Sequence, residues 1–191
     1  MKAIVTFMGF TETTESSSGT ERLYLETIRP FASRSVLTYE PRTWKTDVVT
    51  LAAQLRRFRV EDVAIVSYSH GQAAACALAG LARDYGFDVP LWLACDPVFR
   101  PWWVPRSTLG QLLAVRALIP GSAQITVPKT VGRVAWVRQT TDIPRGHDLI
   151  AEDRRKTLIQ TPLVIPCGHT QIDEADEWRD LVATNLNEFC K

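Results

Sequence analysis

The sequence lacks several features that would assign it to a large functional class. No apolar run reaches the roughly 20 residues that a membrane-spanning helix needs, and the small-residue stretch at 73–82 is closed by Arg83 and Asp84. The formal net charge is only +1, so composition gives no argument for nucleic-acid binding. We find neither internal repeats nor low-complexity segments. A membrane span, a nucleic-acid partner and a repeat architecture are therefore not expected.

Cysteine and histidine are also scarce. The four cysteines form no CxxC pair and no other spacing typical of a metal site. The apolar run at 3–10 is too short for a secretory signal and lacks a small-residue cleavage pattern. We therefore expect reduced thiols, a cytoplasmic location and no metal site. The three histidines are His70, His147 and His169, so few side chains are available as a general base.

Apolar segments typical of buried strands alternate with segments of helical spacing. The expected strands are 3–7, 35–39, 62–67, 91–95, 131–139 and 163–166, and the expected helices are 21–28, 45–58, 70–85 and 174–189. This alternation predicts βαβ units and a mostly parallel sheet with helices on both faces. The fold class is therefore α/β, a three-layer αβα sandwich formed by one domain over residues 1–191. Ligand sites in such sheets lie beyond the carboxyl ends of the strands.

The segment 97–130 interrupts the alternation and predicts a cap or an excursion over the sheet edge. Trp102 and Trp103 lie there among several prolines, ahead of an apolar, helix-like stretch at 109–119. The two tryptophans have two possible roles. They either line an apolar substrate pocket or anchor the excursion to the core.

The most informative stretch runs from Ser67 through Tyr68, Ser69 and His70 to Gly71. A β-branched strand leads into it and a helix rich in alanine leaves it. This context is typical of a nucleophile elbow, which holds a serine on a strained turn with small residues two positions before and after it. The helix start beneath Ser69 favours developing negative charge. The alternative role for Ser69 is that of a helix N-cap.

This stretch resembles the G-x-S-x-G motif of the α/β-hydrolase superfamily, with Ser67 in place of the first glycine. The order of strands and helices resembles that superfamily over most of the chain. The resemblance implies a compact α/β-hydrolase fold and a serine hydrolase that cleaves an ester or thioester of a small-molecule acyl substrate through an acyl-enzyme. This chemistry needs no cofactor. The Ser67 departure and the choice of acid, which stays open below, also allow an inactive, hydrolase-like binding protein.

Two backbone N–H groups are expected to form the oxyanion hole. One belongs to His70, directly after the nucleophile. The other comes from the loop after the first strand, where Gly9 allows close approach and Phe10 or Thr11 supplies the donor.

A serine nucleophile needs a base and an acid that orients the base. The resemblance implies His169 as the base, because the hydrolase family places its catalytic histidine between the last strand and the last helix, and the order Ser, Asp, His is kept. His147 is the reserve. For the acid we prefer Asp96, which directly follows the strand 91–95, over Asp142, which follows the strand 131–139. The segment around Asp96 resembles that of small hydrolases that carry the acid one strand earlier.

Basic residues dominate the segment 97–146, where Asp142 is the sole acid. Arg100 and its neighbours either recognise an anionic group of the substrate or form a solvated basic face. The basic residues are Arg100, Arg106, Arg116, Lys129, Arg133, Arg138 and Arg145.

Overall fold

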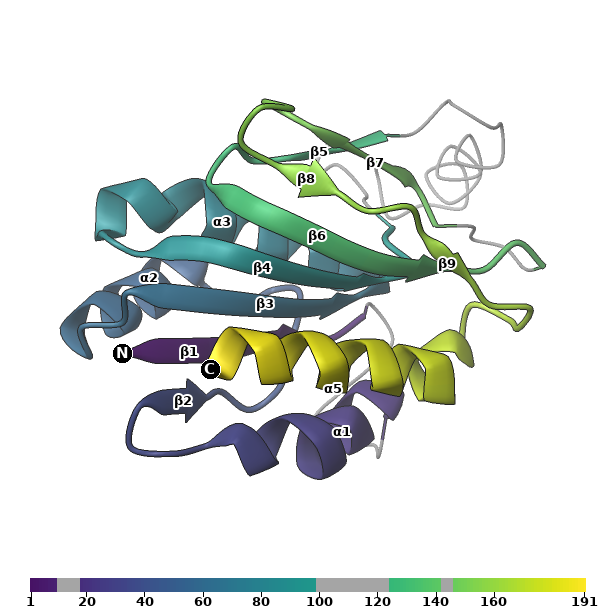
Figure 1. Cartoon of the computed structure of the whole chain (residues 1–191), viewed down its shortest axis with the longest axis horizontal. Helices are drawn as coiled ribbons and strands as arrows, with labels where there is room; N and C mark the ends of the chain where they lie inside the picture. Colours follow the sequence, from purple (N-terminus) through teal and green to yellow (C-terminus); the bar gives the residue numbers. More distant parts are fainter. Residues whose placement is uncertain (10–17, 99–123, 142–145) are drawn as a thin grey trace.

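The computed structural model describes residues 1–9, 18–98, 124–141 and 146–191. Its centre is a seven-stranded sheet in the order β2-β1-β3-β4-β6-β8, in which β9 also pairs with β6 (Figure 1). Every strand pair of this sheet is parallel, so the carboxyl ends of its strands meet at one edge. The strands are β1 (Lys2–Phe7), β2 (Val36–Thr38), β3 (Asp62–Tyr68), β4 (Asp88–Cys95), β6 (Val131–Arg138), β8 (Leu158–Ile159) and β9 (Leu163–Val164).

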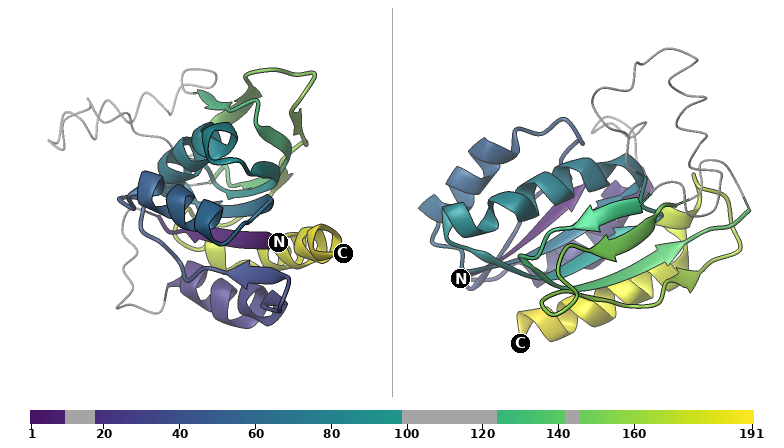
Figure 2. Two further views of the ribbon diagram at one scale, coloured as in Figure 1. Left: turned by 90° about the vertical axis from the view of Figure 1, so that its left-hand side faces the viewer. Right: turned by 90° about the horizontal axis from the view of Figure 1, so that it is seen from above.

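Helices cover both faces of the sheet, which confirms the predicted three-layer α/β class (Figure 2). Helices α2 and α3 bury one apolar cluster against the sheet, and α1 with α5 buries a second cluster on the opposite face. The strand order places β3, and with it the turn that leads into α3, in the middle of the sheet between β1 and β4. The helices are α1 (Gly19–Leu23), α2 (Val48–Arg57), α3 (Gln72–Tyr85) and α5 (Asp176–Cys190).

The unit formed by β3 and α3 follows directly from local sequence. The residues of β3 from Val63 onward are all buried, as expected for a central parallel strand. On α3 the buried side chains include Ala74, Ala75 and Ala79, which are small enough to let the helix lie close to the sheet. The helix ends at Gly86, whose φ of 78° is left-handed and favours glycine.

Several helix boundaries differ from the sequence-based expectation. Helix α2 begins at Val48 rather than 45, because the Asp47 carboxylate caps it by accepting two backbone N–H bonds. Helix α3 begins at Gln72 rather than 70, after a 3-10 turn. The helix expected at 21–28 begins at Gly19 and widens into a π-helical turn over Tyr24–Ile28. A further 3-10 turn covers Arg29–Phe31.

Three short strands were not predicted. Strands β5 (Gln124–Val127) and β7 (Asp148–Ala151) form a separate two-stranded parallel sheet, and β8 is only two residues long. These strands are at most four residues long, and so short a segment shows little or no periodic alternation. Strand β5 lies within the predicted excursion 97–130, of which residues 99–123 lie outside the described residues.

Within the described ranges, no helix combines the length and the apolar character that crossing a membrane would take.

Candidate active site

Ser69 lies at a sharp turn between β3 and α3. Its φ of 49° is left-handed, a conformation that costs a non-glycine residue on the order of 1–3 kcal/mol. The 3-10 turn Ser69–Gly71 then leads into α3. Gly71 is required here, because an added Cβ would lie 2.7 Å from the carbonyl oxygen of Phe7 and 2.8 Å from that of Met8. The backbone at the end of β1 therefore packs directly against this turn and restrains its shape.

Ser67, which departs from the glycine of the resembled motif, has a role of its own. It is buried at the end of β3, and its hydroxyl oxygen accepts a 2.7 Å hydrogen bond from the indole N–H of Trp92 on β4. This bond satisfies the one polar atom of the fully buried Trp92 side chain. The serine side chain is thus accommodated by the neighbouring strand and leaves the turn intact.

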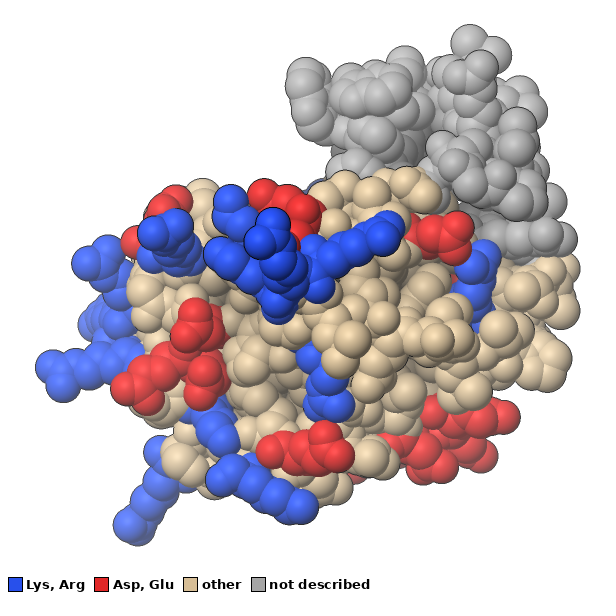
Figure 3. Space-filling model, turned by 45° about the horizontal axis from the view of Figure 1, so that its top comes forward, with Lys and Arg blue, Asp and Glu red and all other residues tan. Residues whose placement is uncertain are grey.

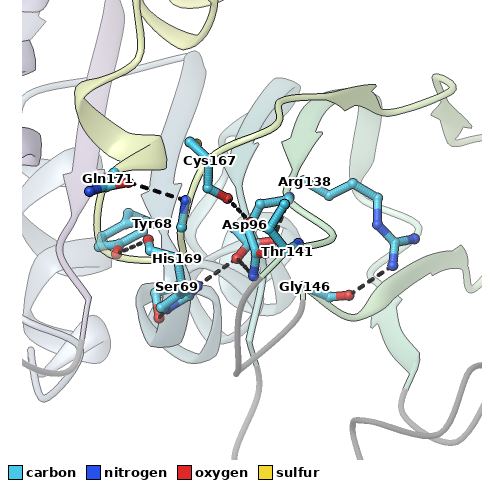
Figure 4. Close-up of polar contacts among 11 residues, drawn as sticks. Tyr68, Ser69, Asp96, Arg138, Thr141, Gly146, Cys167, His169 and Gln171 are labelled. Carbon is cyan, nitrogen blue, oxygen red and sulfur yellow. Dashed lines mark hydrogen bonds and ion pairs between the residues drawn. The ribbon is translucent and has the colours of Figure 1, made fainter.

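His169 lies in the loop between β9 and the 3-10 turn Ile172–Glu174, and its imidazole bridges two side chains (Figure 4). Its Nε2 lies 2.8 Å from the Ser69 hydroxyl oxygen, and its Nδ1 lies 2.5 Å from Oδ2 of Asp96. A carboxylate only accepts, so Nδ1 carries the proton and Nε2 is left to accept from the serine. This is the protonation pattern that a general base requires.

Asp96 directly follows β4 and is completely buried. Its φ of 38° turns the side chain out of the strand direction. The register of β3 and β4 pairs Tyr68 with Cys95, so the next residues, Ser69 and Asp96, leave the sheet side by side. Gly146 packs against the carboxylate, since a Cβ there would lie 2.3 Å from Oδ1. The other predicted acid, Asp142, lies outside the described residues.

The remaining predicted residues have mixed outcomes. Gly9 lies against Tyr68 and Ser69, with an added Cβ 3.3 Å from the Ser69 Cβ, so the end of β1 approaches the turn closely. The ring of His70 packs edge-on against Trp44, at 4.8 Å between centroids. The residues outside the described ranges are the oxyanion candidates Phe10 and Thr11 and the substrate-contact candidates Arg100, Trp102 and Trp103.

The reserve histidine, His147, is buried, but the imidazole at Ser69 is that of His169. The backbone N–H of His147 donates to the Pro97 carbonyl at 2.6 Å, which ties β7 to the segment after Asp96. Burial lowers the pKa of His147, and the charges of Asp96 and Asp148 oppose this shift. Among the residues that the structure describes, no group of three or more His, Cys, Asp or Glu side chains could hold a metal ion.

Described basic residues of the segment 97–146 are paired with acids. Lys129 lies 3.5 Å from Glu152, Arg133 lies 3.2 Å from Glu188, and Arg138 lies 2.8 Å from Asp148. Figure 3 shows Lys and Arg interspersed with Asp and Glu on the face that it presents. Together with their acidic partners, these three residues form a solvated surface of mixed charge.

Tyr68 contributes contacts that the sequence interpretation missed. Its hydroxyl donates to the backbone carbonyl of His169 at 2.7 Å, and its ring stacks on the imidazole, with centroids 5.5 Å apart and an interplanar angle of 28°. The available signal was the position of Tyr68 next to Ser69, but its hydrogen-bond partner His169 is 101 residues away in the chain. Tyr68 thus fastens the His169 loop to the end of β3.

Removal of the Tyr68 hydroxyl is expected to destabilise the protein. In Tyr68→Phe the buried carbonyl of His169 loses its donor, and we expect the free energy of unfolding to fall by about 1–2 kcal/mol. Tyr39→Phe is the matched control, because within the described residues the Tyr39 hydroxyl oxygen is buried without a hydrogen-bond partner. Urea denaturation of both variants measures the difference. Equal midpoints for the two variants would contradict the assignment.

No known protein family matches the chain, and no curated protein matches it. Among solved structures, the chain is similar to the type II thioesterase BorB from the borrelidin biosynthetic cluster. The identity is 14% over 100% of this chain and 93% of that chain, with a TM-score of 0.49. A likeness of this size does not extend to function.

Proposed function

We propose that this protein is a serine hydrolase that cleaves an ester or thioester through an acyl-enzyme intermediate. One observation carries the proposal: a continuous series of hydrogen bonds runs from the Ser69 hydroxyl through the His169 imidazole to the Asp96 carboxylate. The serine stands on a strained turn, the imidazole has its accepting nitrogen toward it, and the acid is wholly buried. This combination of nucleophile, base and orienting acid defines acyl-transfer sites on unrelated folds.

In the proposed reaction the Ser69 oxygen attacks the carbonyl carbon of the substrate while His169 Nε2 takes the hydroxyl proton. The imidazolium then gives that proton to the leaving alcohol or thiol, and the acyl group stays on Ser69. Water, activated by the same nitrogen, releases the acid and regenerates the serine. Asp96 holds the Nδ1 proton throughout and stabilises the imidazolium electrostatically.

The negative charge on the tetrahedral oxygen needs donors that are fixed before the reaction begins. The backbone N–H of His70, at the start of the turn that leads into α3, is the first donor in this proposal. The second comes from Phe10 or Thr11, because Gly9 brings this strand end against Ser69. The amino end of α3 adds a favourable electrostatic field.

Covalent labelling tests the proposal directly. A fluorophosphonate probe is expected to label the wild-type protein stoichiometrically and to leave Ser69→Ala unlabelled, since the probe reacts only with an activated serine. Ser35→Ala, which changes an exposed serine far along the chain, is the matched control and should label normally. A parallel assay with p-nitrophenyl esters and acyl thioesters then separates the two substrate classes.

The second hypothesis, an inactive binding protein on the same fold, predicts the opposite result. A folded wild-type protein that neither labels nor hydrolyses any ester or thioester would favour it. The departure at Ser67 and the choice between two acids prompted this hypothesis, and the hydrogen bond from Trp92 to Ser67 supports the hydrolase proposal because it gives the serine a structural role.

A further inference from the structure

Gln139 contacts both oxygens of the Asp96 carboxylate. It is the first residue after β6, the strand next to β4, and it is completely buried. Its backbone N–H donates to Oδ1 at 3.2 Å, and its side-chain Nε2 donates to Oδ2 at 3.2 Å. Oδ2 is also the oxygen that accepts from His169 Nδ1. One residue therefore supplies two donors to the carboxylate that faces the imidazole.

The orientation of the Gln139 amide is itself fixed. Its Oε1 accepts a 2.8 Å hydrogen bond from the backbone N–H of Thr141. A flipped amide would set its oxygen against the Asp96 carboxylate and its NH₂ against that N–H, so both contacts would become repulsive. The Thr141 hydroxyl in turn donates to the carbonyl of Cys167 at 2.5 Å, in the loop that carries His169 (Figure 4).

We propose that Gln139 is a positioning residue for the reaction: it sets the rotation of the Asp96 carboxylate so that Oδ2 faces His169 Nδ1. The inference rests on the serine-hydrolase function proposed above. A buried carboxylate with only one hydrogen-bond partner would keep unsatisfied lone pairs, which lowers stability. It would also be free to rotate away from His169. A neutral amide satisfies the lone pairs and leaves the negative charge available to stabilise the imidazolium.

The surroundings of the carboxylate favour this role for Gln139 over another residue. Gly146 presents only backbone to Oδ1 and offers no side-chain donor. His147 is close enough for its titration to respond to the charge of Asp96, but burial favours its neutral form. Arg138, the nearest residue of β6 with a full charge, is directed away to Asp148 and to the carbonyl of Gly146. The described side-chain donors to Asp96 are thus those of His169 and Gln139.

Two substitutions separate positioning from simple packing. Gln139→Met keeps the length and approximate volume but removes the side-chain donor, and we expect fluorophosphonate labelling to slow by about 10- to 100-fold, the size found when side chains that bind a metal lose the partner that orients them. In Gln139→Glu, the new side chain can donate to Asp96 only while its carboxyl group is protonated. When it ionises, two carboxylates face each other and repel. The labelling rate of Gln139→Glu relative to Gln139→Met should therefore rise as the pH falls.

Gln124→Met, a change of an exposed glutamine on β5, is the control and should label at the wild-type rate. The proton on His169 Nδ1 provides a readout that does not depend on catalysis. Its downfield NMR resonance should be sharp in the wild type and in the control, and broadened or shifted upfield in Gln139→Met. If Gln139→Met keeps both the wild-type labelling rate and the wild-type resonance, the positioning role is wrong. If the wild type itself never labels, the hydrolase proposal fails, and the resonance still tests Gln139.

Discussion

Asp96→Asn is expected to lower kcat by about 10⁴-fold, the effect typical of losing the acid of a serine triad while its geometry is kept. The asparagine NH₂ can take either carboxylate position, and with its oxygen at the Oδ1 position, where the backbone N–H of Gln139 donates, the NH₂ takes the Oδ2 position. The NH₂ would then face His169 and force the proton onto Nε2. An imidazole in that tautomer has no lone pair toward Ser69 and is unable to accept the hydroxyl proton.

The opposite placement of the amide also impairs the site. With the asparagine oxygen at the Oδ2 position it accepts from His169 and from Gln139 Nε2, but its NH₂ meets the backbone N–H of Gln139 and the imidazolium loses the negative charge that would stabilise it. Steady-state kinetics on an activated ester measure the loss, and circular dichroism checks that the variant is folded. Asp142→Asn is the discriminating comparison and should retain most of the activity. A large loss in Asp142→Asn with little change in Asp96→Asn would assign the acid to the later position.

The second large effect is expected for Gly71→Ala, because the new methyl group has no space. Its Cβ would lie 2.7 Å and 2.8 Å from the carbonyl oxygens of Phe7 and Met8. These are backbone atoms at the end of a central strand, so they cannot rotate away as a side chain would. We expect the free energy of unfolding to fall by about 3 kcal/mol, the upper end for overpacking in a rigid core. Labelling at Ser69 should be lost as well, since relief of the clash moves the turn.

Gly80→Ala is the matched control for this prediction. Gly80 lies inside α3, and an added Cβ there meets no atom within 4 Å. Replacing a helix-interior glycine by alanine is expected to raise the free energy of unfolding by about 1 kcal/mol. Urea denaturation and fluorophosphonate labelling of both variants test the pair. A Gly71→Ala protein with unchanged stability and labelling would show that β1 does not restrain the turn.

Tertiary contacts support Asp96 as the acid in our proposal. Asp96 follows β4, which is the immediate neighbour of the strand that carries Ser69. The end of β6, one strand further out, contributes Gln139 in place of a charged group. Under our proposals, the end of β4 supplies the acid and the end of β6 supplies the amide that orients it.

The sequence by itself determined the local elements that carry the site. The run from Asp62 to Tyr85 predicted a buried strand, a sharp turn and a helix rich in alanine, because each of these depends on residues that are close together in the chain. The alternation of strands and helices likewise predicted a parallel sheet with helices on both faces. The histidine loop and both candidate acids were identified from their places after strands.

Only the tertiary structure decided which of these groups meet. Asp96 contacts His169 across 73 positions of sequence, and Tyr68 reaches the same loop across 101. Such contacts depend on strand order and register, which periodicity does not encode. The role of Gln139 is hidden for the same reason, since a glutamine after a strand has no distinctive pattern until its partner is known. Local sequence fixes secondary structure through short-range sterics and hydrogen bonding, whereas the site arises from long-range packing of the strand ends.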